Sequence, residues 1–343
     1  MPKAISLFSG AGGDTLGLEN AGVTVCGFVE WEEPMIETHL LNFPNSALIG
    51  KDIREVSEEQ LIPYIGEIDI IFAGFPCQGL SKAGKKDKND ERNNLFKEFV
   101  RITNIIKPRW IIGENVKHIL RMETPSGQSV PVVIRQSFEE IGYTMAEPMV
   151  LKANKYETPQ KRERCFFVGY RDPIEQFSWD RVLSHERDSE TLHTILEPTL
   201  ENAIVITDEQ ARHYGVMRWI EVPEGTEPTG KPPTNLIKCI ACSELSFGKR
   251  ASPTHSEIVD PNGYSKTLIC TYNRMPRMFV ALRCGTKLYL RPYTIDEAKQ
   301  IQGFPKNYKI SGNRLSAIKQ IGNAVPSKIV ETIAKTLLEE RDP

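Results

Sequence analysis

Short apolar runs and amphipathic segments alternate along the first half of the chain. The apolar runs are rich in β-branched residues and predict strands, and the segments between them predict helices. This alternation is typical of a parallel sheet covered on both faces, so we expect a doubly wound α/β lobe. The predicted strands are residues 4–8, 24–29, 46–49, 68–73, 109–113, 143–150 and 164–170, and the predicted helices are 14–21, 33–42, 57–65, 93–106 and 128–141.

The periodicity weakens between about residues 172 and 290, where short apolar runs are separated by Pro and Gly turns. A final helix is predicted at about 326–340, because it begins at Pro326 and carries apolar residues at helical spacing. That helix can pack on the first lobe, so the chain is expected to leave this lobe and return to it. We predict a large domain of residues 1–171, a smaller, loop-rich domain of residues 172–290, and a return segment of residues 291–343 that completes the large domain.

Composition is ordinary for a globular protein, with 40% hydrophobic and 26% charged residues. The N-terminus does not resemble a signal peptide, and no stretch reaches the roughly 18 apolar residues of a membrane span. We therefore expect a soluble, cytoplasmic protein without a membrane partner. The seven scattered cysteines are typical of reduced thiols. Cys239 and Cys242 form a Cys-x-x-Cys pair with only His255 as a nearby further ligand, so we expect no metal.

The net charge of −2 conceals an uneven distribution along the chain. Residues 172–230 carry thirteen acidic side chains against four arginines and no lysine. Residues 231–287 carry nine basic side chains against three acidic ones. The second stretch is equally compatible with a phosphate-binding surface and with a solvated charged face.

Small residues follow the first predicted strand, in the segment Phe8-Ser-Gly-Ala-Gly-Gly13. Such a loop lets the backbone approach a ligand at the carboxyl edge of a parallel sheet. Thr15 stands where a dinucleotide fingerprint needs its third glycine, which argues against a nicotinamide dehydrogenase. Glu30 ends the second predicted strand, about where an acidic side chain binds ribose hydroxyls.

Cys77 lies just beyond the fourth predicted strand, in Gly74-Phe-Pro-Cys77-Gln78. A lone cysteine is usually an inert buried residue, but open α/β sheets bind ligands at the carboxyl ends of their strands. This position favours a nucleophile. The polar stretch 79–94 that follows is long enough to act as a lid.

Charged groups lie at the ends of two later strands. The fifth predicted strand delivers Glu114 to the same edge, since sequential strands of such sheets are usually neighbours. The segment Gln160-Lys-Arg162-Glu-Arg164 enters the last strand, where alternation puts Arg162 and Arg164 on one face. Taken alone, these arginines would be surface residues balanced by Glu163. Because Cys77 and Glu114 both follow strands that end at this edge, we expect a thiol and a carboxylate to lie close together there.

Taken together, these segments resemble the motifs of the DNA cytosine-5 methyltransferase family, and the resemblance covers nearly all of the chain outside residues 172–287. The similar segments are Phe8–Gly13 for the cofactor loop, Pro76-Cys77-Gln78 for the nucleophile, Glu114-Asn115-Val116 for base binding, Gln160–Arg164 for the arginine motif, and, for the last two motifs, Arg291-Pro-Tyr-Thr with Gln302-Gly-Phe-Pro305 and Gln320-Ile-Gly-Asn323-Ala-Val-Pro326. One departure is Ser6, where many members carry Asp.

The resemblance implies a Rossmann-like methyltransferase lobe that uses S-adenosyl-L-methionine, and a small target-recognition domain. Its substrate would be a cytosine within a short sequence of double-stranded DNA. The enzyme would act as a monomer and belong to a restriction-modification system. It would form no stable complex with the restriction endonuclease. The implied catalytic residues are Cys77, Glu114, Arg162 and Arg164. The implied cofactor-binding residues are Phe8, Gly10, Gly12, Gly13, Glu30, Trp31, Asp52, Ile53, Pro76, Asn323 and Ala324. The residues expected to contact DNA are Gln78, Ser81, Lys249, Arg250, Arg274, Arg277 and Arg291.

The implied chemistry requires these groups. Carbon 5 of cytosine is a poor nucleophile, so the Cys77 thiolate must first add to carbon 6, with Arg162 or Arg164 lowering the thiol pKa. Negative charge then spreads toward N3 and O2, where a protonated Glu114 and Arg164 would stabilise it. The base must first be flipped out of the duplex, and Gln78 or a small-domain residue would fill the gap.

Two rival functions share parts of this pattern. A tRNA cytosine-5 methyltransferase would carry the same large-domain residues and differ in the small domain. A non-catalytic DNA-binding homologue would be expected to lack Cys77, Glu114 or the arginines, all of which are present. The methylated sequence itself is not predicted, because base contacts are made by individual side chains of a loop-rich domain.

Overall fold

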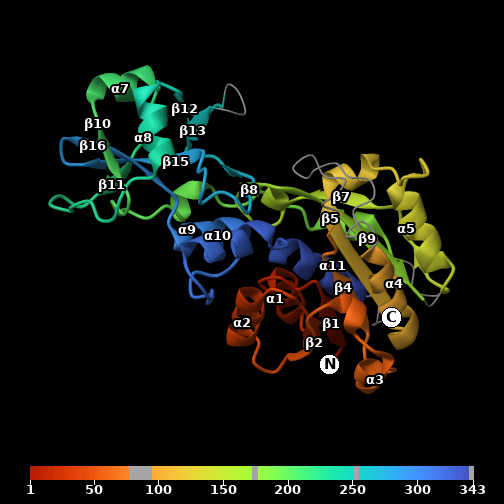
Figure 1. Ribbon diagram of the computed structural model, residues 1–343. Coiled ribbons are helices and arrows are strands. Elements are labelled where there is room, and N and C mark those ends of the chain that lie inside the picture. The colour runs from red at the N-terminus through yellow and green to blue at the C-terminus, as the bar shows by residue number, and fades with distance from the viewer. Residues whose placement is uncertain (77–94, 172–176, 251–254, 340–343) are drawn as a thin grey trace.

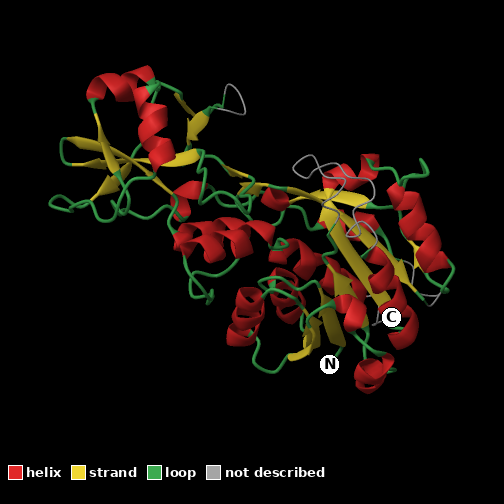
Figure 2. Ribbon diagram, viewed as in Figure 1, coloured by secondary structure: helices red, strands yellow, loops and turns green. Residues whose placement is uncertain are grey.

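The computed structural model describes residues 1–76, 95–171, 177–250 and 255–339, and places them in two lobes, each built around its own sheet (Figure 1). Helices flank the strands in both lobes (Figure 2). Within the described ranges, no helix has the length and apolar character that crossing a bilayer requires.

The large lobe contains an eight-stranded sheet in the order β3-β2-β1-β4-β5-β9-β6, with β7 also paired to β9. The first five strands of this order run parallel, and β9 is antiparallel to β5. The strand order reverses between β1 and β4, and open α/β sheets bind ligands at the carboxyl ends of the strands beside such a reversal. The strands are β1 (Lys3–Leu7), β2 (Thr24–Val29), β3 (Ala47–Gly50), β4 (Ile70–Ala73), β5 (Trp110–Val116), β6 (Thr144–Met145), β7 (Met149–Lys152) and β9 (Glu163–Tyr170).

Helices cover both faces of this sheet, so neighbouring residues of β1 are buried in two different cores. Ile5 and Leu7 belong to a core with α3 (Glu58–Leu61), α4 (Phe96–Ile106) and α5 (Val130–Glu139). Ala4 belongs to the opposite core, which contains residues of α1 (Gly13–Asn20), α6 (Trp179–Ser184) and α11 (Ser327–Glu339). The helix α2 (Glu33–Asn42) follows β2. The predicted doubly wound α/β lobe and its returning final helix are confirmed.

Two predicted elements are interrupted, and each interruption contains a proline. The strand predicted at 143–150 is split into β6 and β7 around Pro148, which has no N–H to donate to a sheet. The helix predicted at 57–65 ends as α3 at Leu61 and continues as a 3-10 turn, Ile62–Tyr64, that contains Pro63. The single strand and the single helix were therefore wrong in these two places.

The small lobe contains a six-stranded sheet in the order β10-β16-β15-β13-β12, with β11 paired to β15. Its strands are β10 (Ile204–Ile206), β11 (Ile220–Val222), β12 (Leu245–Phe247), β13 (Ser256–Ile258), β15 (Met278–Cys284) and β16 (Lys287–Pro292), and its helices are α7 (Asp208–His213) and α8 (Thr234–Ala241). Because α6 packs in the large lobe and β16 continues to Pro292, the predicted limits at 172 and 291 do not coincide with the edges of this sheet. The domain limits stay predictions.

A junction of four short elements joins the lobes. The strand β8 (Gln160–Lys161) precedes β9 of the large sheet and pairs in parallel with β14 (Ser265–Lys266). The helices α9 (Ile295–Gln302) and α10 (Arg314–Asn323) follow β16 and lie between the two sheets in Figure 1. Segments that are more than 100 residues apart in the chain therefore meet beside the arginine motif.

Candidate active site at the carboxyl edge of the large sheet

The loop after β1 makes a tight turn against the return segment. Phe8, Gly10 and Gly12 all have left-handed backbone conformations, with φ of 59°, 56° and 78°. Glycine adopts this conformation freely, whereas Phe8 does so at a cost of order 1 kcal/mol or more. A Cβ on Gly13 would lie only 2.4 Å from the carbonyl oxygen of Val325. The small residues therefore allow the loop to pack directly on the chain that leads into α11.

Glu30 links this loop to the end of β2. Its buried carboxylate accepts hydrogen bonds from the backbone N–H groups of Gly10 at 2.8 Å, Trp31 at 2.9 Å and Glu32 at 2.9 Å. Burial raises the pKa of Glu30, and these three bonds oppose that shift. A carboxylate can accept about four hydrogen bonds, so one acceptor position is left for a ligand hydroxyl. The neighbouring Trp31 ring is 68% exposed, which is unusual for a large aromatic side chain.

One of the implied cofactor-binding side chains, Asp52, which the resemblance pairs with the adenine of the cofactor, is already engaged. Asp52 accepts from the backbone N–H of Arg54 at 3.0 Å and pairs with its guanidinium at 2.6 Å, which lowers the pKa of Asp52. Ile53 is buried directly after it, at the start of a 3-10 turn. Arg54 would have to share or release Asp52 before an adenine amino group could bind.

Two buried titratable groups support the cofactor loop, and the sequence pattern marks neither of them. His39 lies 2.8 Å from Ser9 Oγ through its Nδ1 and stacks on Phe28 at 3.7 Å between ring centroids. Burial lowers the pKa of His39 to about 3, so this imidazole is neutral. Asp14 accepts a hydrogen bond from Ser6 Oγ, and its burial raises the pKa of Asp14 to about 7. The departure at Ser6 was the available signal, because a second acid there would have faced Asp14.

The proposed nucleophile, Cys77, lies outside the described residues, as do Gln78 and Ser81. The chain up to Pro76 is described, and its course is held by Asn115, whose Nδ2 donates to the carbonyl oxygen of Phe75 at 2.8 Å. Asn115 therefore fixes the backbone two residues before Cys77.

Gly74 marks the point where the separate motifs meet. A Cβ at this position would lie 3.8 Å from the carbonyl oxygen of Phe8, 3.9 Å from Glu114 Oε2 and 3.5 Å from Val325 Cγ2. The cofactor loop, the end of β4, the end of β5 and the return segment thus surround one position. This convergence is what the order of the parallel strands predicts.

Glu114 and Arg164 form a buried ion pair on the adjacent strands β5 and β9. Arg164 Nε lies 2.9 Å from Glu114 Oε1, and the two side chains are 14% and 10% exposed. Burial raises the pKa of Glu114, while the charges of Arg164 and Arg162 oppose this shift. A carboxyl group in this setting can hold a proton more readily than an exposed glutamate can.

Arg162 occupies a different environment from Arg164. The extended chain is interrupted at Arg162, between β8 and β9, and its side chain is fully buried. The guanidinium donates to the carbonyl oxygens of Leu268 at 3.1 Å, Gly322 at 3.1 Å and Ala324 at 3.0 Å. Burial lowers the pKa of Arg162, and the nearby charge of Arg164 adds to this effect. Arg162 therefore connects the arginine motif to the small lobe and to the end of α10.

The return segment places its predicted cofactor residues at the end of α10. Ala324 is buried, and its carbonyl oxygen also accepts from Gln302 Nε2 at 2.7 Å. Asn323 is exposed beside it. These contacts hold the segment that packs on Gly13.

The residues predicted to contact DNA differ in their exposure. Lys249 and Arg274 are exposed, and Arg250 and Arg277 are partly buried. Arg291 is completely buried and pairs with Glu297 at 2.6 Å. A side chain without exposed surface cannot reach a DNA phosphate, so the prediction for Arg291 is wrong.

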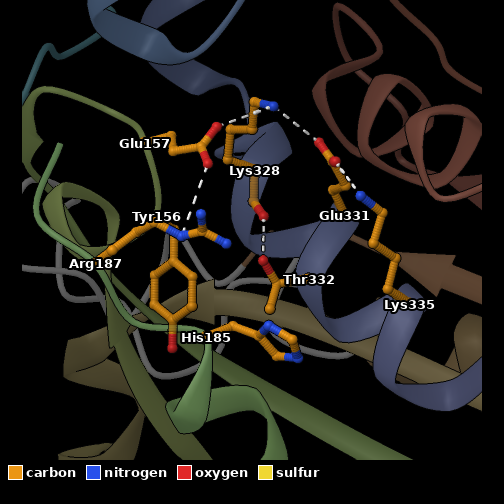
Figure 3. A pocket seen from close by; sticks show the side chains of 8 residues that line it. All are labelled: Tyr156, Glu157, His185, Arg187, Lys328, Glu331, Thr332 and Lys335. Carbon is orange, nitrogen blue, oxygen red and sulfur yellow. Dashed lines mark hydrogen bonds and ion pairs between the residues drawn. The ribbon is translucent and has the colours of Figure 1, made fainter. Parts of the chain in front are cut away.

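A hollow of about 240 Å³ lies on another part of the large lobe, between α11 and the loops around residues 156–157 and 185–187 (Figure 3). Lys328 bridges Glu157 at 3.4 Å and Glu331 at 3.1 Å, and Lys335 also pairs with Glu331 at 2.7 Å. No predicted site residue lines this hollow, so we do not include it in the site. Among the residues that the structure describes, no group of three or more His, Cys, Asp or Glu side chains could hold a metal ion.

The fold and the converging motifs define an α/β enzyme with a ligand site at the switch point of its sheet. The chain belongs to the C-5 cytosine-specific DNA methylase family, whose model matches residues 2–339. This membership confirms the prediction of a DNA cytosine-5 methyltransferase.

Relatives cover nearly the whole chain. It is 32% identical over 343 residues to the type II methyltransferase M.FnuDI of Fusobacterium nucleatum, covering 98% of this chain and 94% of that protein. It is 30% identical over 380 residues to the type II methyltransferase M.DdeI of Desulfomicrobium norvegicum, covering 97% and 88%. The fold is similar to that of the S. pombe Dnmt2 methyltransferase, with a TM-score of 0.66 at 15% identity and full coverage of both chains.

Proposed function

We propose that the protein transfers the methyl group of S-adenosyl-L-methionine to carbon 5 of a cytosine within a short specific sequence of double-stranded DNA. Convergence around Gly74 is the observation that carries this proposal, because it brings the Glu114 carboxyl to the cofactor loop at the strand end that leads to Cys77. The type II methyltransferases among the relatives support a role as the modification enzyme of a restriction-modification system. We further propose that it acts as a monomer in the cytoplasm, without a stable complex with a cognate endonuclease.

The residues around the β1 loop fit the cofactor. Glu30 has an acceptor position left for a ribose hydroxyl, and the exposed Trp31 ring offers a flat apolar surface beside it. When bound, the cofactor supplies an electrophilic methyl group. The residues proposed to hold it are Phe8, Gly10, Gly12, Gly13, Glu30, Trp31, Asp52, Ile53, Pro76, Asn323 and Ala324.

The residues of the chain then activate the base. Cys77 adds as a thiolate to carbon 6, which makes carbon 5 nucleophilic. Glu114 shares its proton with N3 and Arg164 donates to O2, so both interactions strengthen as the ring gains negative charge. Carbon 5 would then take the methyl group that the cofactor supplies. A base or water accepts the proton of carbon 5, and the bond between carbon 6 and Cys77 breaks, which releases the thiolate and restores the aromatic ring.

The two arginines have separate proposed roles. Arg164 contacts Glu114 at 2.9 Å and can reach the same base, so we assign it as the catalytic arginine. Arg162 has two of its nitrogens committed to three carbonyl oxygens, so we assign it as a positioning residue that also contributes positive charge near Cys77.

Transfer of a tritiated methyl group to duplex DNA and to tRNA tests the proposal. We expect label in DNA, at a short sequence that bisulfite sequencing would locate, whereas label in tRNA alone would favour the rival function. The Cys77→Ala variant should lose transfer and keep its binding to cofactor and DNA. A duplex with 5-fluorocytosine at the target should form a denaturant-stable adduct with the wild type, because the fluorine cannot leave as a proton does. Turnover by Cys77→Ala would exclude Cys77 as the nucleophile.

A further inference from the structure

Two lysines face each other where the lobes meet. The parallel pairing of β8 with β14 places Lys266 directly opposite Lys161. Neighbouring strands lie about 4.8 Å apart, and directly paired side chains share one face of the sheet. Like charges in this arrangement destabilise a pair of strands. The pairing therefore has an electrostatic cost in the free protein.

Two arginines of the small lobe extend this group. Arg250 Nη2 donates to the carbonyl oxygen of Arg277 at 3.5 Å. Burial lowers the pKa of Lys266, and the charges of Arg250 and Lys161 lower it further. Burial and the charge of Arg277 likewise lower the pKa of Arg250. We call Lys161, Arg250, Lys266 and Arg277 the junction cluster.

The described residues balance this charge only in part. Glu257 pairs with Lys266 and is the carboxylate that the described part of the chain brings into contact with the cluster. The buried Nε of Arg250 has no hydrogen-bond partner among the described residues. The exposed Lys161 and the partly exposed Arg250, Lys266 and Arg277 thus offer several positive charges to an anion.

The cluster is attached to the candidate active site by direct contacts. Thr267 Oγ1 donates to the carbonyl oxygen of Lys161 at 3.1 Å, and the N–H of Leu268 donates to Gln160 Oε1 at 2.9 Å. Arg162 donates to the carbonyl oxygen of the same Leu268. The cluster therefore lies beside the arginine motif, with Lys161 from the large lobe and its other three members from the small lobe.

We propose that the junction cluster binds one phosphate group of the DNA backbone near the nucleotide whose base enters the active site. This inference rests on the proposed function, since it takes duplex DNA as the ligand. An anion held between Lys161 and Lys266 would turn their repulsion into two attractions and would fix the two lobes relative to each other. Lysine acts as a point charge on phosphate and carries no base sequence information, so the cluster orients the DNA rather than reads it.

The variant Lys161→Gln tests this site most cleanly. It should bind cognate and non-cognate duplexes more weakly by the same factor, and the slope of log Kd against log salt should fall by about 1. Its melting temperature should equal or exceed that of the wild type, because one of two opposed charges is gone. Lys266→Gln should show the same change in slope, but it also leaves Glu257 unpaired, so its stability must be measured separately.

The matched control is Lys287→Gln, an exposed lysine paired with Cys284 at the turn between β15 and β16. Its salt slope should match that of the wild type. An unchanged slope in Lys161→Gln, or a change in the ratio of cognate to non-cognate affinity, would overturn the phosphate assignment. Wild-type transfer to DNA shows separately whether the proposed function holds, so failure of one inference is distinguishable from failure of the other.

Discussion

In the described part of the chain, two buried arginine–glutamate pairs lie beside the two sheets, and they are built differently. In the small lobe, Glu297 accepts from two nitrogens of Arg291 at 2.6 and 2.7 Å, and from two backbone N–H groups at 2.7 and 2.8 Å. Both side chains are fully buried. In the large lobe, Glu114 meets Arg164 at 2.9 Å, and both side chains keep some exposed surface.

This difference separates a structural pair from the pair that we propose to be reactive. A buried ion pair offsets the cost of desolvation only when its remaining acceptors and donors are also bonded. Glu297 meets this condition, and it also completes the capping box of α9 with Thr294. Glu114 keeps Oε2 directed toward the gap at Gly74, and burial raises its pKa. Because Glu114 keeps some exposed surface and its pKa is raised, it would be able to exchange a proton with a substrate.

The largest expected effect comes from removing the acid at the reactive pair. Glu114→Gln should lower the single-turnover rate of methyl transfer by about 10²–10⁴-fold, the range typical of acid–base groups. Binding to DNA and to the cofactor should change little, because N3 becomes more basic only as the ring accepts the thiolate. A wild-type rate in this variant would show that Glu114 has no part in the mechanism. The two arginine–glutamate pairs would then not differ in reactivity.

At the structural pair, the expected effect is on stability. Arg291→Met leaves the Glu297 carboxylate buried without its cation, so the free energy of unfolding should fall by about 3–5 kcal/mol. Urea unfolding would measure this loss, and the rate per folded molecule should stay near that of the wild type. Normal stability with loss of DNA binding would instead restore Arg291 as a DNA contact.

The smallest effect concerns Asp14, a buried carboxyl group beneath the cofactor loop. Because its pKa is raised to about 7 from the ordinary 3.8, the folded protein retains a proton there that the unfolded chain releases. Stability should therefore fall as pH rises from about 4 to 7. Asp14→Asn should remove this loss and be more stable than the wild type at pH 8, by on the order of 1–4 kcal/mol.

Urea titrations of both proteins across this pH range provide the check. The two should have similar stability at pH 4, where Asp14 is protonated in the folded protein. Parallel curves at all pH values would show that Asp14 is ionised in the folded state. Such a result would mean that the large lobe tolerates a buried charge without a paired cation.

Most of the large sheet could be predicted because its signals are local. Apolar runs of four to six residues marked β1, β2 and β4, and the described residues just beyond them lie at one edge as predicted. The errors near Pro63 and Pro148 also have a local cause, since a proline lacks an N–H donor. The partnership of Asp14 with Ser6 was missed, because neither residue type advertises burial by itself.

The sequence by itself determined the α/β architecture, the family motifs and the position of Glu114 at a strand end. Only the tertiary structure showed that Arg162 and Arg164 have different surroundings, although simple alternation puts them on one face. Arg162 turns to carbonyl oxygens of Leu268 and Gly322, 106 and 160 residues away in the chain. The burial of Arg291 likewise depends on tertiary contacts, which include the carbonyl oxygen of Glu197, 94 residues away in the chain. The position of an arginine side chain depends on the hydrogen-bond acceptors around it. Only folding brings acceptors that are so distant in the sequence within its reach.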